Sequence, residues 1–443
     1  MIKFDCFGLS LKNLFKTRVI LISIENFNRE FVGKNILSSS FAKKGYIVLL
    51  AHKSIVRALV SYLPLRNNIY IEKGNRLGSI KYLSKAKKNN LLIYTFDEEG
   101  LMQTDVDTYS RKNHEKRSVK LIDGIFSWGP QHTELLKKCG FKNYQILKTG
   151  NTRFDYYLIN KKKNNLKLYS NNGCILICSR FASANPNKEV KSKTEFRDGN
   201  AKYINDSKKM LRLMLNIPRL IREENIKNKI IIRPHPSESK IIWEKACEGL
   251  DNVFISCEAP IHEMLLETSV LIHNRCTTAI EGFLSNVNVI SYEPFNLDSP
   301  PSPNKEFINS FANCICYSDK ELLKRLKANN LNNNIPSKNN ANEYLYNLKS
   351  LSSSKIVEKI YSLYPFKFKK NNLSLILIFA FIPIIILHHK IYKIFYRVFR
   401  FKYYSYLKQK NGNIKFAKFL DFKEDYLRIR FFSKISLFLP LKK

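Results

Sequence analysis

The sequence predicts an α/β protein built from two doubly wound, Rossmann-like domains and a C-terminal appendage. Its 443 residues are enough for two domains of ordinary size and a further segment. In two successive blocks, short apolar runs alternate with stretches of helical spacing, which is typical of a parallel sheet flanked by helices. A polar linker separates the blocks, and an apolar, basic segment follows the second one.

Residues 1–160 form the first block and are expected to be an N-terminal Rossmann-like domain. Six short apolar runs bounded by polar turns predict its strands, and helix-length segments lie between most of them. The predicted strands are Val19–Ile24, Tyr46–Ala51, Asn68–Glu72, Leu91–Phe96, Gly124–Trp128 and Gln145–Thr149.

Residues 172–345, after a linker rich in Lys and Asn, are expected to form a second Rossmann-like domain. The Asn-rich stretch Asn329–Asn342 predicts a loop, and Glu343–Tyr364 has the spacing of a helix that closes this domain. The predicted strands are Cys174–Ser179, Lys229–Arg233, Val253–Cys257, Val270–His273 and Val289–Tyr292.

Residues 346–443 are expected to complete this helix and to form a membrane-associated helical tail. Leu373–Leu387 is fifteen residues without a charge, fewer than the roughly 20 that span a bilayer as a straight helix. Basic residues flank it on both sides and give no crossing direction. The sequence favours a re-entrant or interfacial anchor, with the aromatic and basic stretch Ile391–Tyr406 among anionic head groups. A buried apolar helix with a basic face is the alternative.

The composition is strongly basic, with 75 Lys plus Arg against 37 Asp plus Glu and a formal net charge of +38. This charge suits nucleic acid, anionic lipid or phosphorylated substrates, but no nucleic-acid-binding motif is visible and nucleic acid is not an expected partner. The nine Cys lack the paired spacing of a zinc site, which indicates reduced thiols. The N-terminal residues lack the apolar run of a signal peptide. We therefore expect the protein at the cytoplasmic face of the inner membrane.

Three unusual loops follow predicted strands, at the edge where ligands bind in an open parallel sheet. The first loop consists of Asp97, Glu98, Glu99 and Gly100, directly after Leu91–Phe96. Three adjacent acids repel one another, and such crowding can leave one carboxylate ready to accept a proton. A sugar hydroxyl that attacks an activated donor needs such a base. A solvated acidic turn explains the same residues equally well.

The second loop begins at Arg233 and continues through Pro234, His235 and Pro236. The two prolines fix φ and remove backbone donors, so they restrict the directions that His235 can take. Arg233 and His235 are candidates for binding the phosphate of a nucleotide leaving group and offsetting its charge. A histidine bound to backbone carbonyls is the less favoured alternative.

The third loop leaves Val270–His273 and opens a helix. Free amides and hydroxyls at a helix start form an anion site that the helix dipole reinforces, although an N-cap threonine without a ligand gives the same pattern. The candidate nucleotide- or phosphate-binding residues of the second and third loops are Arg233, His235, Pro236, Asn274, Arg275, Thr277, Thr278 and Glu281.

A fourth stretch, Thr149–Asp155, ends the first block. It places Gly150, Asn151 and Arg153 where a cleft between the domains is expected. An ordinary interdomain turn, with Arg153 and Asp155 as a structural pair, is an equally good explanation.

Taken in order, the segments DEEG, WGPQH, TGNTRFD, IIRPHPSE and HNRCTTAIEG…VISYEP resemble the bacterial family of surface carbohydrate biosynthesis proteins over roughly Leu91–Pro294. They are more loosely similar to bacterial sialyltransferases and polysialyltransferases, whose pattern is two acids and Gly, then His-Pro, then paired Ser or Thr. Two positions depart from the family, since Thr152 stands where Pro is usual and Arg275 where Gly is usual. Arg275 either pairs with a donor carboxylate or blocks the site.

The resemblance implies a GT-B fold, with the donor in the C-terminal domain and the acceptor toward the N-terminal domain. It implies that an acid is the base, with Glu98 as first choice before Glu99 and Asp97. Some related Kdo transferases use an acid as nucleophile, so the stereochemical course stays open. The resemblance further implies that the CMP of the donor is held by His235, which with Pro236 matches the His-Pro motif, and by the hydroxyls of Thr277 and Thr278.

No Asp-x-Asp motif stands at an expected strand end, so a reaction without metal or other cofactor is expected. The expected function is transfer of a CMP-activated ulosonic acid, such as Kdo or a nonulosonic acid, in capsule or lipopolysaccharide biosynthesis. The partners would be this nucleotide-activated sugar, a lipid-linked or growing glycan acceptor, and anionic inner-membrane lipid. The alternatives are a CDP-glycerol or CDP-polyol phosphotransferase of the teichoic-acid kind and a noncatalytic basic protein that binds membrane or nucleic acid.

Overall fold

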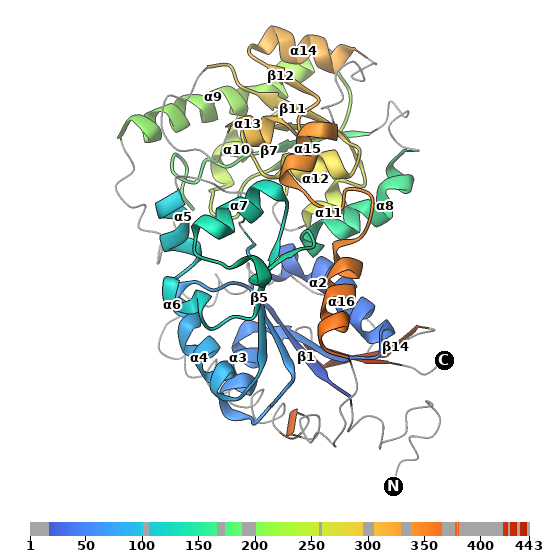
Figure 1. Cartoon of the computed structure of the whole chain (residues 1–443). Helices are drawn as coiled ribbons and strands as arrows, with labels where there is room; N and C mark the ends of the chain where they lie inside the picture. Colours follow the sequence, from blue (N-terminus) through green and yellow to red (C-terminus); the bar gives the residue numbers. More distant parts are fainter. Residues whose placement is uncertain are drawn as a thin grey trace, which may run out of the picture. The chain divides into compact units, whose positions relative to one another are not determined.

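The computed structural model divides the chain into two compact units, whose elements are drawn in Figure 1. The first unit comprises Met1–Tyr156 and Glu343–Lys443, and the second comprises Tyr157–Asn342. The C-terminal segment therefore belongs to the first unit, whereas the sequence led us to expect that it closes the second. The residues that the structure describes are 17–98, 100, 106–165, 173–187, 201–256, 259–295, 305–328, 338–365, 377, 378, 380, 420–423, 426–431 and 435–440.

The first unit contains a sheet of order β13-β14-β15-β2-β1-β3-β4-β5-β6, in which β1 to β6 are parallel. All six parallel strands lie where the sequence predicted strands, which confirms that prediction. Their residues are almost all apolar because both faces of a parallel sheet are covered. The strands are β1 (Val19–Ile24), β2 (Ile47–His52), β3 (Ile69–Glu72), β4 (Leu92–Thr95), β5 (Gly124–Ser127) and β6 (Ile146–Lys148).

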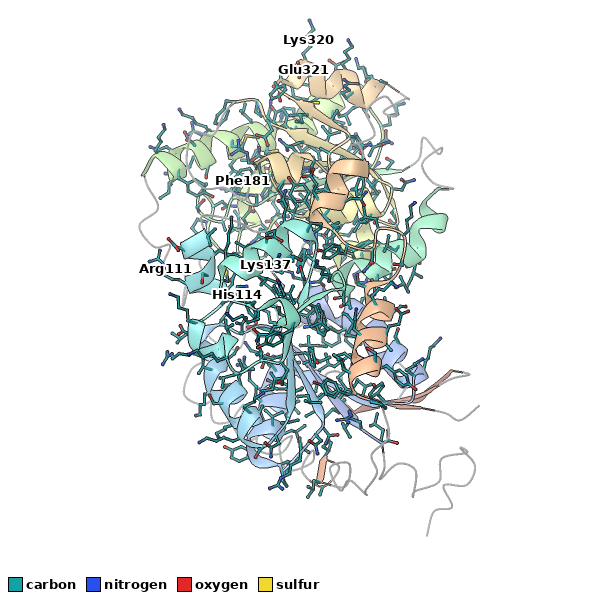
Figure 2. All side chains as sticks on the ribbon, in the orientation of Figure 1. Arg111, His114, Lys137, Phe181, Lys320 and Glu321 are labelled. Carbon is teal, nitrogen blue, oxygen red and sulfur yellow. The ribbon has the colours of Figure 1, made fainter. Side chains whose placement is uncertain are left out.

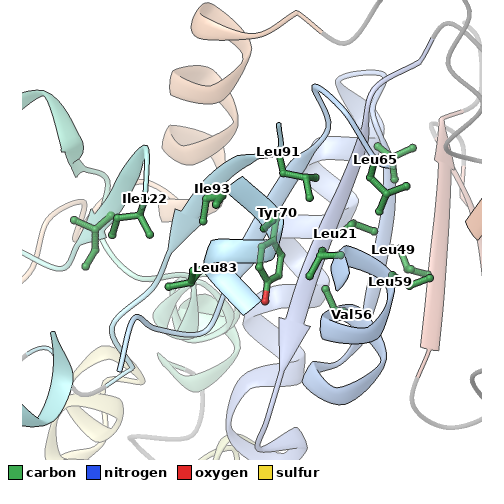
Figure 3. Close-up of a cluster of buried hydrophobic side chains, with 14 of the residues drawn as sticks. Leu21, Leu49, Val56, Leu59, Leu65, Tyr70, Leu83, Leu91, Ile93 and Ile122 are labelled. Atoms are coloured by element: carbon green, nitrogen blue, oxygen red, sulfur yellow. The ribbon is translucent and has the colours of Figure 1, made fainter. Parts of the chain in front are cut away.

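Helices of the first unit cover both faces of this sheet. On one face, Leu21 of β1 and Tyr70 of β3 pack in a cluster with Leu59 of α3 and Leu83 of α4 (Figure 3). On the other face, residues of β1 such as Ile22 pack against α2 and α16. One strand supplies both cores because successive side chains point to opposite faces. The helices are α2 (Phe27–Lys43), α3 (Lys53–Tyr62), α4 (Ile80–Lys88), α5 (Val106–Asn113), α6 (Lys116–Val119), α7 (Pro130–Lys138), α15 (Lys338–Tyr344, ending in this unit) and α16 (Ser352–Leu363), with short 3₁₀ turns at Leu77–Ser79, Asn143–Gln145 and Thr152–Phe154.

The tail of the chain adds three antiparallel strands to the β2 edge of this sheet, where the sequence led us to expect helices. They are β13 (Leu420–Lys423), β14 (Tyr426–Phe431) and β15 (Ile435–Pro440), and β15 pairs with β2. The helical prediction was wrong for this part because β14 alternates apolar residues with Arg428 and Arg430, which is the period of a strand.

The apolar stretch Leu373–Leu387 lies mostly outside the described residues, as does all of Ile391–Tyr406. Ile378 is 1% exposed and packs in the same cluster as Leu21. Part of the stretch therefore contributes to the core of the first unit. Across the described ranges, we find no helix with both the length and the apolar character that a membrane crossing requires.

The segment expected as one helix over Glu343–Tyr364 is two helices, α15 and α16, joined by a turn in which Asn347 has a φ of +61°. Asp155 fixes the start of α16, because its carboxylate accepts the backbone N–H groups of Ser352 and Ser353 at 2.8 Å each. This capping interaction attaches the C-terminal helix to the first unit and replaces the expected pair between Asp155 and Arg153.

Replacing Asp155 by alanine is expected to lower the free energy of unfolding of the first unit by about 1–2 kcal/mol. The change leaves two N–H groups of a buried helix start without an acceptor. The effect is measured by urea unfolding monitored through the fluorescence of Trp128. Of the two tryptophans in the sequence, Trp128 is the one that lies in this unit. Asp155→Asn keeps one carbonyl acceptor and should lose less. Equal stability of Asp155→Ala and the wild type would contradict the capping role.

The second unit contains a six-stranded parallel sheet of order β12-β11-β10-β7-β8-β9. Five of its strands confirm the sequence prediction, and β12 was missed because it is three residues long and mostly half-exposed. The strands are β7 (Cys174–Cys178), β8 (Ile230–Arg233), β9 (Val253–Ile255), β10 (Thr268–His273), β11 (Asn288–Tyr292) and β12 (Cys314–Cys316).

The two faces of this sheet are covered by different helices. Ile177 and Ile232 point to the face covered by α9 and α10, where Trp243 is fully buried. On the opposite face, a Cβ at Gly282 of α12 would lie 2.8 Å from Leu271, so the absence of a side chain lets α12 approach the sheet closely. The helices are α8 (Asp155–Asn165, beginning in the first unit), α9 (Ala201–Glu223), α10 (Ile241–Ala246), α11 (Ile261–Met264), α12 (Thr278–Leu284), α13 (Lys305–Asn309) and α14 (Asp319–Lys327).

Candidate functional site

In the first unit, Asp97 lies two residues after the end of β4, at the carboxyl edge of the sheet, and is 4% exposed. The Tyr109 hydroxyl donates to Asp97 Oδ2, and the Nε2 atoms of His114 and His132 lie 3.3 and 3.5 Å from the same oxygen. The Tyr109 oxygen is 3.2 Å from each of these Nε2 atoms. The four side chains form one buried, hydrogen-bonded cluster.

The partners of the two imidazole rings determine where their protons lie. His132 accepts the Trp128 backbone N–H at Nδ1, 3.0 Å away, so its Nε2 carries the proton. His114 donates Nδ1–H to Asn75 Oδ1 at 2.7 Å. Donor atoms of Asp97, His114 and His132 lie within 4.8 Å of one another, close enough to share a metal ion. A protonated Nε2 cannot ligate a metal, so the His132 tautomer favours a proton-sharing cluster over a metal centre.

Burial and hydrogen bonding act in opposite directions on the pKa values of this cluster. Burial alone would raise the pKa of Asp97, but hydrogen bonds from His114 and His132 hold that pKa well below its usual range. Burial lowers the pKa of His132 and keeps its ring neutral. Asp97 is therefore an ionised acceptor that its own neighbours already satisfy, which leaves it little capacity to take a proton from a substrate.

Glu98, the next residue, is buried in a chain of ion pairs. Its Oε1 lies 3.1 Å from Nζ of Lys34, which also contacts Glu30 at 2.8 Å. Glu30 is 3.7 Å from Lys73, and Lys73 binds the partly exposed Glu25. Burial alone would lower the pKa of Lys34, but the charges of Glu30 and Glu98 raise it. The acidic loop is thus balanced by internal cations, and Glu99 lies outside the described residues.

The WGPQH segment attaches this loop to the rest of the first unit. Nε1 of Trp128 donates to the Asp97 carbonyl oxygen at 2.6 Å, and the Trp128 carbonyl oxygen accepts the Tyr346 N–H at 2.6 Å. A Cβ at Gly129 would lie 2.1 Å from the Tyr344 carbonyl oxygen. Trp128 and Gly129 therefore have structural roles, because they hold the acidic loop and the returning C-terminal segment together.

Gly150, Asn151 and Arg153 form the turn after β6. Gly150 has a φ of +79°, and a Cβ there would lie 2.4 Å from Ser352 Oγ. Asn151 is 3% exposed and accepts the Arg153 backbone N–H at 2.9 Å. Arg153 is half-exposed, with its guanidinium 5.9 Å from the ring centre of Phe154. The structure gives Gly150 and Asn151 internal contacts in the first unit and leaves only the Arg153 side chain accessible.

In the second unit, three side chains form a row across the carboxyl ends of adjacent strands. His273 of β10 is in register with Cys178 of β7, and Cys178 is in register with Arg233 of β8. Residues in register point to the same face of a sheet, and here it is the face near α12, because Thr278 hydrogen-bonds to Cys178. The loops that follow β8 and β10 thus leave the sheet at one level, on either side of β7.

Two donors in this row are buried without a partner in the described part of the chain. His273 is fully buried, and its Nδ1 accepts the Cys276 N–H at 3.4 Å, so the unpaired Nε2 carries the proton. The Nε of Arg233 is likewise buried and unpaired. A buried donor without an acceptor costs about 1–3 kcal/mol. His273 Nε2 and Arg233 Nε could therefore each donate one more hydrogen bond, to an acceptor that the described residues do not supply.

His235 and Pro236 are exposed, although the loop that carries them is firmly held. The buried carboxylate of Glu238 accepts from Ser179 Oγ at 2.8 Å, from the Phe181 N–H at 2.7 Å and from the His235 N–H at 3.2 Å. Figure 2 labels Phe181 in this part of the second unit. Glu238 thereby joins the loop after β8 to the loop after β7 and presents His235 at the surface.

Arg275, in the loop after β10, points inward. Its Nη2 and Nε lie 3.0 and 3.1 Å from Oε2 of Glu293, and the two side chains are 4% and 1% exposed. The φ of Arg275 is +48°, a conformation that glycine adopts at lower cost. In this structure the guanidinium is engaged in an internal ion pair, and the two roles considered from the sequence stay predictions.

The remaining candidates of this loop differ in accessibility. Asn274 is buried and donates to the Tyr292 carbonyl oxygen at 2.8 Å. Thr277 is half-exposed, and Thr278 is 7% exposed at the start of α12. The seven residues of α12 give only a weak dipole. Thr277 is thus the accessible hydroxyl of the pair.

Glu281 of α12 is buried near Arg233, and both lie within electrostatic range of His262 on α11. Burial lowers the pKa of His262. The sequence indicated Arg233 and Glu281 but missed His262 and His273. A polar residue that ends an apolar run, as His273 does in VLIH, is the signal that could have revealed the latter.

Acidification is expected to destabilise the second unit through His273. Burial and the charge of Arg180 lower the pKa of His273 to about 3. The unfolded chain binds a proton below about pH 6.5 and the folded chain does not, so stability falls by about 1.4 kcal/mol per pH unit from there toward pH 3. Unfolding free energies between pH 7.5 and 4.5 measure this slope. His273→Asn keeps an acceptor for the Cys276 N–H and should flatten it; an unchanged slope would refute the assignment.

Two parallel α/β units, with a chain that returns to the first at Glu343, define a GT-B-like fold. No protein-family model and no curated protein matches the sequence. Similar solved structures include a UDP-GlcNAc 2-epimerase from Methanocaldococcus jannaschii, with 12% identity over 78% of this chain and 99% of that chain and a TM-score of 0.49. S. aureus MnaA with UDP has 10% identity over 80% and 99% and a TM-score of 0.48. The wall teichoic acid polymerase TagF, as its H548A variant, has 13% identity over 80% and 90% and a TM-score of 0.46.

Proposed function

We propose that this protein is a glycosyltransferase of bacterial surface polysaccharide biosynthesis that uses a nucleotide-activated sugar. The observation that carries the proposal is the pair Arg233 and His235 at the carboxyl edge of the second unit. Arg233 has a buried donor without a partner in the described residues, and His235 is exposed on a loop that Glu238 fixes. A fixed guanidinium and an exposed imidazole on one loop are suited to the phosphate of a nucleotide.

In the proposed reaction, the bond between the anomeric carbon and the donor phosphate breaks while an acceptor hydroxyl forms the new glycosidic bond. Negative charge develops on the departing phosphate, and Arg233 and His235 stabilise it. Thr277 and Glu281 complete the candidate nucleotide site, the former through its accessible hydroxyl. Asn274 and Arg275 support the loop through Tyr292 and Glu293.

The acceptor hydroxyl must lose its proton, and the acidic loop of the first unit supplies the proposed base. Glu98 remains the first candidate, because its ion pair with Lys34 occupies only one of its two carboxylate oxygens. Asp97 is less suitable, since the Tyr109 hydroxyl and the imidazoles of His114 and His132 surround one of its oxygens. Glu99 is the second candidate. We propose that no metal takes part and that the charge of the leaving group is met by the side chains of the second unit.

The proposed donor is a CMP-activated ulosonic acid, such as Kdo or a nonulosonic acid, and the support for it is the motif resemblance. Thermal shifts with CMP, UDP and GDP test this choice. Stabilisation by CMP is expected, at about 2.7 kcal/mol when the nucleotide is present at 100 times its Kd. Stabilisation by UDP or GDP without CMP would overturn the donor assignment.

Product analysis separates glycosyl transfer from transfer of a polyol phosphate. Purified protein incubated with CMP-, CDP- and UDP-linked donors should give a new glycosidic bond and release the free nucleotide. A phosphodiester in the product would identify a CDP-polyol phosphotransferase instead. No product with any donor would favour a noncatalytic binding protein.

We propose that the protein works at the cytoplasmic face of the inner membrane, on a lipid-linked or growing glycan. The support is the basic composition and the apolar stretch Leu373–Leu387 with its basic flanks. Sedimentation with vesicles of anionic lipid tests it. A soluble fraction that lipid leaves unchanged would argue against membrane contact.

A further inference from the structure

A basic groove of about 1420 Å³ follows the edge strand β6 of the first unit. It passes around this edge from one face of the sheet to the other, because its lining includes Val106 of α5 and Leu363 of α16. These helices pack on opposite faces, with Ile146 of β6 in one core and Leu147 in the other. Its lining contains none of the residues of the carboxyl-edge loops described above.

The side chains that line the groove carry far more positive than negative charge. Lys87 lies in it but is neutralised by Asp123 at 2.8 Å, and Asp107 is the other acid of the lining. The remaining six lysines are all exposed and form no salt bridge within the described ranges. They are Lys116, Lys120, Lys138, Lys142, Lys148 and Lys359. Clustered like charges in a concave surface raise the local potential and concentrate anions.

Aromatic and apolar side chains lie among these lysines. Tyr144 is 82% exposed and Leu363 is 56% exposed, and Tyr364 also lines the groove. An exposed tyrosine combines an apolar ring face with a polar hydroxyl, which suits the mixed surface of a sugar ring. The groove thus offers both charge and stacking surfaces along its length.

We propose that this groove binds an acidic glycan chain, namely the part of a growing polyanionic acceptor that lies beyond the end being extended. This inference rests on the proposed function and deepens it by naming the chemistry of the acceptor. A flat bilayer could reach only the rim of a concave surface, whereas a single extended chain can enter it. Binding the distant part of the chain would raise the effective concentration of its end and favour repeated addition.

Charge reversal at two groove lysines tests the proposal. Binding of a fluorescent oligosialic acid to the full chain is measured by anisotropy, with uncharged dextran of equal length as the neutral probe. For Lys120→Glu/Lys142→Glu we expect affinity to fall by about tenfold or more, and wild-type affinity to fall as salt rises. The matched control is Lys320→Glu/Lys324→Glu on α14, where both lysines are exposed (Lys320 is labelled in Figure 2). It changes the net charge equally and should alter affinity by less than about twofold.

Equal losses in the two variants would overturn the proposal, because binding would then follow net charge alone. It would also be overturned if the groove variant lost binding to phosphatidylglycerol vesicles and kept binding to the oligosaccharide, since the groove would then be a membrane-docking surface.

Thermal midpoints show whether each variant is folded. Turnover of a short neutral acceptor should be unaffected in the groove variant. If the wild type lacks turnover but binds the oligosaccharide through these lysines, the proposed function fails and the acidic-chain site stands.

Discussion

Replacing Arg233 by alanine is expected to lower kcat/KM for sugar transfer by about 100- to 1000-fold. Arg233 ends β8 in register with Cys178, so the sheet fixes its position before any ligand binds. Its buried Nε has no acceptor in the described chain, and the side chain as a whole is partly exposed, so a phosphate can reach the accessible part of a guanidinium with unused donors. A donor that is already in place when charge develops stabilises the transition state without reorganisation, and its removal exposes that charge.

Steady-state kinetics with the donor identified by thermal shift measure the effect of Arg233→Ala. Arg233→Lys keeps the charge but loses the planar fork of donors, so it should recover only part of the rate. Arg212 of α9 is exposed and provides the control, since Arg212→Ala should stay within about twofold of the wild type. If Arg233→Ala is as active as Arg212→Ala, the phosphate role assigned to this residue is wrong.

Replacing Glu293 by alanine is expected to lower the free energy of unfolding of the second unit by about 3–5 kcal/mol. The substitution leaves the guanidinium of Arg275 charged and 4% exposed, without its carboxylate partner. A buried charge that loses its partner must either be hydrated or keep the full desolvation penalty, and both outcomes disrupt the loop after β10. Fluorescence of Trp243, the tryptophan of this unit, reports the transition during urea unfolding.

A double variant distinguishes the lost ion pair from damage at one position. Arg275→Gly/Glu293→Gln removes both charges and suits the positive φ at position 275, so it should be more stable than Glu293→Ala. The exposed pair of Lys327 and Glu224 supplies the control, and Glu224→Ala should cost less than about 1 kcal/mol. Similar losses in Glu224→Ala and Glu293→Ala would show that the buried pair contributes no special stability.

The parallel strands could be predicted from the sequence because each is a continuous apolar run between polar turns. VILISI of β1 and IVLLAH of β2 are buried almost throughout, and that local pattern needs no knowledge of the neighbouring strands. The three strands at the tail have a weaker, two-residue period within a basic segment and were mistaken for helix. β12 was too short to leave a pattern.

The carboxyl-edge position of the candidate loops was also predictable, since strand ends can be located from the sequence. The partners of individual side chains were not. Lys34 and Glu98 are far apart in the chain and meet only because α2 packs on the sheet near the end of β4. Likewise, nothing in the sequence near Arg275 indicates that Glu293 would engage its guanidinium. Long-range pairing of this kind depends on the tertiary fold.

The order of the two units along the chain has a consequence for folding during synthesis. The second unit is encoded without interruption, so it can fold as soon as Asn342 has left the ribosome. The first unit cannot finish at that stage, because α16 packs on its sheet and β15 pairs with β2 only after nearly the whole chain has emerged. Until then, the β2 edge and the surface under α16 stay uncovered and accessible to chaperones. A nascent chain arrested after residue 342 should therefore show a protease-resistant second unit beside a sensitive first one.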